Sequence, residues 1–143
     1  MTDFQTDAEI ARLAEGFLDL TLPKEAWTHT AHFAAALWLL TTRGAETYAE
    51  MPGMIRRFNA AKGGVNSETE GYHETITIAS LRAAEQVLKA APEGAGLAES
   101  LQALMAGPFG KPDWILAYWS KGRLFTPEAR LGWIEPDLAP LPF

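Results

Sequence analysis

The amino-acid sequence predicts an all-α fold, a single-domain irregular bundle of about six helices that covers residues 1–143. Apolar residues recur at the three- and four-residue intervals of amphipathic helices, and no stretch alternates apolar and polar residues over a strand's length. Alanine is abundant, whereas valine and isoleucine are scarce. With 143 residues, 48% of them hydrophobic, the chain is long and apolar enough to bury one core.

Capping signals mark the first two helices. A helix over residues 7–20 follows Thr6, whose hydroxyl suits an N-cap. The second helix is expected to end at Arg43, but its start has two interpretations: Pro23 is its first residue, or Thr28 caps it. Because the later part of this helix is apolar on nearly all sides, it should lie at the centre of the bundle.

Two further helical segments occupy the middle of the chain. Residues 45–61 form a helical stretch that Pro52 is expected to interrupt, because proline lacks a backbone donor. A long helix is expected over residues 71–91 or 72–91. A hydroxyl residue just upstream, such as Ser67, should cap it.

The C-terminal third contains shorter helical signals. Helices are expected over residues 97–105 and 112–120, each ended by glycine or a change in pattern. Thr126 followed by Pro127 is a strong start signal for a last helix that ends before the next proline. Residues 137–143 should form an extended tail packed by its apolar side chains.

All three histidines lie in two short motifs near predicted helix starts. His29 and His32 are neighbours on one helical face, so both rings can point at one spot. His73 stands between Glu70 and Glu74. Because clustered imidazoles and carboxylates are typical metal ligands, we expect a divalent metal (zinc, nickel or iron) bound by the three histidines.

Three hypotheses fit these residues. The first is an enzyme, with hydrolysis as the least specific reaction, in which Glu74 transfers protons and Tyr72 is a further catalytic residue. The second is a protein that binds a small molecule without turnover, using the same pocket. The third is structural: His29, His32 and His73 belong to a satisfied buried network that fixes the helix packing.

Four other residues are candidate ligand contacts. Trp27 and Tyr118 can form aromatic walls, and Arg130 can hold an anionic group. Asn59 precedes a glycine-rich loop of the kind that carries ligand contacts. The alternative is that the aromatic residues belong to the core and that the loop is only a helix end.

The charge balance limits the kinds of partner that the protein is expected to bind. A net charge of −6 argues against nucleic acid and against an anionic membrane surface, and leaves a small molecule as the expected partner. The chain has no cysteine, and its first residues lack the basic and apolar regions of a signal peptide. We therefore expect a cytoplasmic protein, with the oligomeric state left open.

Six short motifs resemble those of a family of small, uncharacterised bacterial all-helical proteins: Trp27-Thr-His-x-x-His32, Asn59-x-x-x-Gly63, Tyr72-His-Glu-Thr-Ile-Thr77, Tyr118-Trp-Ser120, Ala129-Arg130 and Pro136-Asp-Leu138. The resemblance runs from Trp27 to the chain end and is most specific at the Tyr-His-Glu-Thr-Ile-Thr element. It implies no particular activity. It does imply that the motifs act together, which makes these the leading site residues: Trp27, His29, His32, Tyr72, His73 and Glu74.

Overall fold

The computed structural model describes residues 4–143 and confirms the all-α fold, with no strand among those residues. Four short 3₁₀ helices lie between or beside the α-helices: Lys24–Ala26, Gly44–Glu46, Pro108–Gly110 and Trp114–Ala117. The α-helices are α1 (Asp7–Leu18), α2 (His29–Arg43), α3 (Thr47–Ala61), α4 (Glu74–Ala90), α5 (Leu97–Ala106), α6 (Lys121–Leu124) and α7 (Pro127–Leu131). Within the described part of the chain, none of them is long and apolar enough to cross a bilayer.

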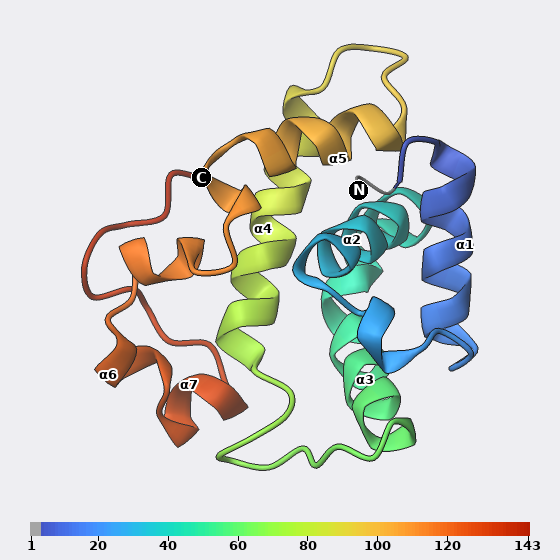
Figure 1. Cartoon of the computed structure of the whole chain (residues 1–143). Helices are drawn as coiled ribbons and strands as arrows, with labels where there is room; N and C mark the ends of the chain where they lie inside the picture. Colours follow the sequence, from blue (N-terminus) through green and yellow to red (C-terminus); the bar gives the residue numbers. More distant parts are fainter. Residues whose placement is uncertain (1–3) are drawn as a thin grey trace.

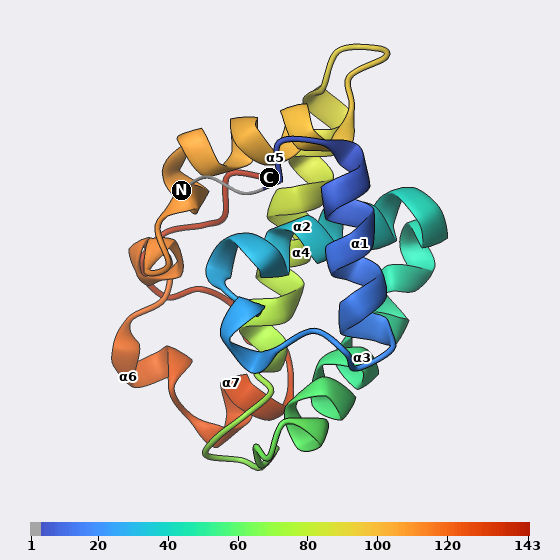
Figure 2. The ribbon, with the colours of Figure 1, turned by 45° about the vertical axis from the view of Figure 1, so that its right-hand side comes forward.

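Helix α2 is the centre of the bundle, as its nearly continuous apolar sequence predicts. It packs against α1, α3, α4 and α5, and its residues from Phe33 to Leu37 are buried on all sides. Helix α4 stands between α2 and the C-terminal segment, which carries α6 and α7 (Figure 1). In the second view, α1 again lies on the outer side of α2, against which it packs (Figure 2).

The predicted caps of the first two helices are confirmed. Thr6 accepts a hydrogen bond from the backbone of Glu9, whose carboxylate accepts from the backbone of Thr6, which completes a capping box. Thr28 accepts from the backbone N–H of Ala31 and caps α2. This decides between the two predicted starts of α2, because Pro23 instead precedes the separate 3₁₀ turn.

The predicted break at Pro52 is wrong, since α3 runs through this residue without interruption. Proline costs a helix one backbone hydrogen bond and crowds the preceding turn. Here the pyrrolidine ring is buried in the same core that Met51 and Ile55 of the helix enter. Burial of this apolar ring offsets the lost bond, so the helix continues.

Helix α4 begins at Glu74, later than predicted, and its cap is His73. Ser67 is not the cap, although its spacing from Glu70 does have a local consequence. The Ser67 hydroxyl accepts from the backbone N–H of Glu70 at 3.3 Å, and the Ser67 N–H donates to the Glu70 carbonyl at 2.9 Å. These bonds close a turn in the loop before α4 rather than start the helix.

The C-terminal segment is less helical than predicted. In place of a helix over 112–120 there is only the 3₁₀ turn Trp114–Ala117, and α6 was not expected. Helix α7 starts at Pro127 after its Thr126 cap, as predicted, but ends after five residues. The indole of Trp119 is fully buried and donates to the carbonyl of Ile134, so tertiary contacts hold this segment in its shape.

Candidate functional site

His32 points an unused ring nitrogen towards a cavity. Its Nδ1 lies 2.7 Å from the carbonyl oxygen of Thr28, so Nδ1 carries the proton and donates it. In the neutral ring the other nitrogen, Nε2, is then an acceptor, and it has no hydrogen-bond partner among residues 4–143. It is not among the fully buried unpartnered atoms, so it remains accessible from the cavity.

Burial keeps this imidazole neutral. Desolvation, together with a smaller effect of the neighbouring His29, lowers the pKa of His32 to about 4, against the opposing effect of the Thr28 carbonyl. The Trp27 indole packs against this ring with centroids 3.9 Å apart and the ring planes tilted by 34°, and it stacks on Phe17 at 4.3 Å. These aromatic contacts help to hold the imidazole in place.

The cavity beside His32, the His32 cavity, lies between α3, the loop after it and the starts of α2 and α4. Its volume is about 510 Å³. The apolar part of its wall comprises Trp27, Ile55, Phe58, Tyr72 and Ile76. The polar part comprises Lys24, Asn59, Lys62, Glu70, His73 and Thr77.

His73 lines the same cavity, but neither of its ring nitrogens is available. Nε2 donates to the carbonyl oxygen of Leu124 at 2.8 Å, and Nδ1 accepts from the backbone N–H of Ile76 at 3.2 Å. Burial, and to a smaller degree the positive charge of Arg130, lowers the pKa of His73. This histidine is the N-cap of α4 and joins that helix to α6.

His29 lies on the far side of His32 and does not line the His32 cavity. Its Nε2 donates to the carbonyl oxygen of Phe109 at 2.8 Å, which ties the start of α2 to the turn after α5. Its ring also packs edge to face on Phe33. His29 and His32 do line another cavity together, beside Phe33 and Ile76, but His73 does not line that cavity, so the three rings do not converge on one space.

The structure does not assemble the predicted three-histidine metal centre. No group of three or more histidine, aspartate or glutamate residues within positions 4–143 could hold a metal ion. At His73 the backbone engages both ring nitrogens, so this ring has none left for a metal, whereas His29 and His32 each keep one nitrogen and lack the third imidazole of the predicted centre. The spacing of three residues places His29 and His32 near each other but directs them to different neighbours.

The two predicted catalytic residues, Tyr72 and Glu74, are hydrogen-bonded to each other. The phenol of Tyr72 donates to the carboxylate of Glu74 at 2.6 Å, and its ring is covered by the guanidinium of Arg56. Burial first, and then the bond to Glu74, raises the pKa of Tyr72. Tyr72 lines the His32 cavity, whereas Glu74 does not.

The loop before α4 is fastened to α3 by amide side chains. Asn59 Nδ2 donates to Asn66 Oδ1 at 3.0 Å, and the same oxygen accepts from the backbone N–H of Tyr72 at 3.1 Å. Gly71 has a φ of 84°, and a Cβ there would lie 2.1 Å from the carbonyl of Val65. Asn59 therefore both lines the cavity and shapes its wall.

Two predicted ligand contacts lie elsewhere. Tyr118 lines a different depression, beside Phe109 and Trp114, and not the His32 cavity. Arg130 donates from its guanidinium to the carbonyl of Gly71 at 2.9 Å, so it fastens α7 to the loop before α4.

Sequence reasoning missed the two lysines of the cavity, Lys24 and Lys62. Their signals were present, since Lys24 follows Pro23 just before the Trp27 motif and Lys62 precedes the predicted glycine-rich loop. The side chain of Lys62 donates to the carbonyl of Leu20 at 3.0 Å. Its charge is thereby held at the cavity wall.

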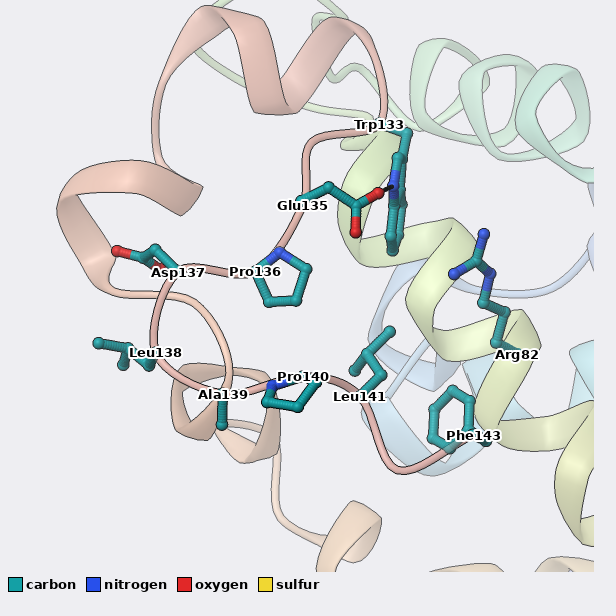
Figure 3. Close-up of a pocket in the computed structure, with 10 residues that line it drawn as sticks. All are labelled: Arg82, Trp133, Glu135, Pro136, Asp137, Leu138, Ala139, Pro140, Leu141 and Phe143. Carbon is teal, nitrogen blue, oxygen red and sulfur yellow. Dashed lines mark hydrogen bonds between the residues drawn. The ribbon is translucent and has the colours of Figure 1, made fainter.

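A further cavity of about 470 Å³ lies under the C-terminal tail, away from all three histidines (Figure 3). The guanidinium of Arg82 stands 4.4 Å from the centroid of the Trp133 ring, whose indole N–H donates to Glu135 at 2.6 Å. These polar groups already have partners, as does Asp137, which accepts from Ser120, and the rest of the wall is proline, aliphatic side chains and the Phe143 ring. The tail cavity therefore offers less chemistry than the His32 cavity.

Comparison of the chain with protein-family models, curated proteins and solved structures gave no match. The resemblance to a bacterial family stays a prediction. The chemistry of the site consequently has to be inferred from its geometry.

Proposed function

We propose that this protein binds a small molecule in the His32 cavity, with Nε2 of His32 accepting a hydrogen bond from the ligand. The observation that carries the proposal is the oriented, neutral imidazole that lines the cavity and whose second nitrogen has no partner among the described residues. A polar atom left unpaired beside an apolar wall is costly unless water or a ligand pairs with it. The cavity volume, about 510 Å³, suits a small organic molecule.

Binding without turnover is favoured over catalysis, including hydrolysis, for two reasons. The carboxylate proposed to transfer protons, Glu74, already accepts from Tyr72. An imidazole whose pKa is about 4 is a weak general base near neutral pH, where catalytic bases have pKa values close to the working pH. The same low pKa keeps His32 a reliable acceptor.

Screening of a fragment library by thermal shift, followed by ¹⁵N spectroscopy of the histidine rings, tests the proposal. Bound fragments should shift the Nε2 resonance of His32 and lose affinity in His32→Asn, whose amide can still donate to Thr28. The matched control is His29→Gln, whose amide can still donate to the Phe109 carbonyl. Fragments that bind His32→Asn and wild type equally, or a library without a fragment that shifts Nε2, would overturn the proposal.

A further inference from the structure

A second cavity, of about 420 Å³, lies on the other side of His32 and Ile76, which line both cavities. His73 of the His32 cavity and Phe125 of the second cavity also pack edge to face, with ring centroids 6.3 Å apart. The two spaces are therefore neighbours divided by a few side chains. His32 stands at the division, with its Nε2 unpaired.

The second cavity is predominantly apolar. Its wall comes from α2, α4 and the segment after α5, and includes Phe33, Ile76, Trp114, Ile115, Leu116 and Phe125. The polar part of the wall comprises His29, His32, Asp113 and Ser80. This space suits a hydrocarbon chain or ring.

The His32 cavity, in contrast, carries two positive charges and one negative charge: Lys24, Lys62 and Glu70. Neither lysine forms an ion pair within residues 4–143, where the ion pairs are Arg43 with Glu50 and Lys89 with Glu85. Lys62 is held in place, since it donates to a carbonyl and lies 5.5 Å from the centroid of the Phe58 ring. The excess of unpaired positive charge favours an anionic group on the ligand.

We infer that the ligand is an amphipathic carboxylic acid with a hydroxyl or amide N–H between its two ends. Its carboxylate would lie near Lys24 and Lys62, its apolar chain or ring would fill the second cavity, and its central donor would pair with His32. A separate donor is required because a carboxylate and a neutral imidazole Nε2 both only accept hydrogen bonds. This inference rests on the proposed function of the His32 cavity.

Calorimetric titration of the intact protein with N-octanoylglycine and its truncated analogues tests the three ligand groups. N-acetylglycine lacks the apolar chain, N-octanoylglycinamide lacks the charge, and octanoate lacks the central donor. Each loss should weaken binding by about tenfold or more, because each removes burial, an ionic contact or a hydrogen bond. Replacing N-octanoylglycine by 3-hydroxyoctanoate distinguishes an amide donor from a hydroxyl donor.

Substitutions assign the ligand groups to residues. Lys62→Met should weaken N-octanoylglycine more than the uncharged amide, and Glu70→Gln should strengthen binding of the acid by about threefold by removing a like charge. Ser80→Leu, which fills the second cavity, should weaken N-octanoylglycine and leave N-acetylglycine unaffected. Thermal unfolding of each variant checks that it is folded.

The outcomes separate the two proposals. Equal affinity for the long and short acids, or for the acid and its amide, overturns the amphipathic ligand. If none of the acids binds while screened fragments still depend on His32, the ligand class is wrong and the proposed function stands. If no compound of either kind depends on His32, both fail.

Discussion

His32 and His73 lie at the starts of neighbouring helices, line the same cavity, and both have a pKa lowered first of all by burial. At His73 the backbone engages both ring nitrogens, whereas at His32 it engages one. The first arrangement joins two parts of the chain, and the second leaves an acceptor for a ligand. Burial and a lowered pKa therefore do not distinguish a structural from a binding histidine, but the partner of the second nitrogen does.

The largest effect is expected from His73→Ala. It removes the cap of α4, leaves the carbonyl of Leu124 without a donor and opens a void, which together should lower the free energy of unfolding by about 4 kcal/mol. Chemical denaturation at pH 7 measures this. His73→Asn, which can still cap the helix but cannot reach Leu124, should lose about half as much. If the free energy of unfolding of the alanine variant falls by less than about 1 kcal/mol, His73 does not hold α4 and the C-terminal segment together.

Acid should weaken the fold through His32. The pKa of His32 is about 4 in the folded protein against an ordinary value of 6.5, so the unfolded chain takes up the proton first as the pH falls. The stability it contributes is complete above pH 6.5 and declines towards pH 4, where the loss should reach about 3 kcal/mol. Burial also lowers the pKa of His73, so this residue likewise reduces the stability of the fold as the pH falls.

The comparison with His32→Asn isolates the His32 contribution to this pH dependence. Denaturation curves recorded from pH 7 to pH 4 should show the variant losing less stability than wild type, since asparagine does not titrate. Parallel pH dependences for the two proteins would mean that His32 is not held neutral by the fold.

A smaller loss is expected at Thr75, which reinforces the junction around His73. Its buried hydroxyl lies 2.7 Å from the carbonyl of Ala129 and accepts from the backbone N–H of Ile134 at 3.2 Å. Thr75→Val keeps the shape but removes these bonds, so the free energy of unfolding should fall by about 2 kcal/mol. Thr75→Ser retains the hydroxyl and should lose less; if both variants lose equally, packing rather than hydrogen bonding accounts for the effect.

The smallest change in stability is expected from His32→Asn at pH 7. The amide can keep the bond to Thr28, and Nε2 has no protein partner to lose, so the free energy of unfolding should change by less than about 1 kcal/mol. Ligand binding in the His32 cavity should nevertheless be lost. Denaturation and calorimetry on the same preparation check both statements, and a large loss of stability would make His32 a structural residue like His73.

The long helices could be predicted from the sequence because their causes are local. Apolar periodicity and the caps Thr6, Thr28 and Thr126 act within a few residues, and the structure has helices where they indicate them. The start of α4 could not be predicted in this way. Its cap, His73, is oriented by Leu124, which lies 51 residues further along the chain.

The candidate site was predicted in part. The Trp27 and His32 motif and the Tyr72 and His73 motif do meet at one cavity, as expected of motifs that act together. The predicted metal centre is absent from the described residues because the backbone engages both nitrogens of His73, which the spacing of residues along the chain does not reveal. Lys24 adjoins the Trp27 motif, but lysine is common on surfaces, so its position in the sequence did not single it out before the fold placed it at the cavity.

The bond from His73 to Leu124 also bears on how the protein unfolds. The Leu124 carbonyl holds the proton on Nε2, which leaves Nδ1 as the acceptor for the amide of Ile76. The cap of α4 and the bond to the C-terminal segment thus stabilise the same tautomer, so docking of Leu124 should strengthen the first turn of the helix. We expect the amide of Ile76 to exchange with solvent only when the C-terminal segment undocks from α4. Its exchange rate would therefore show whether the middle and the end of the chain unfold together.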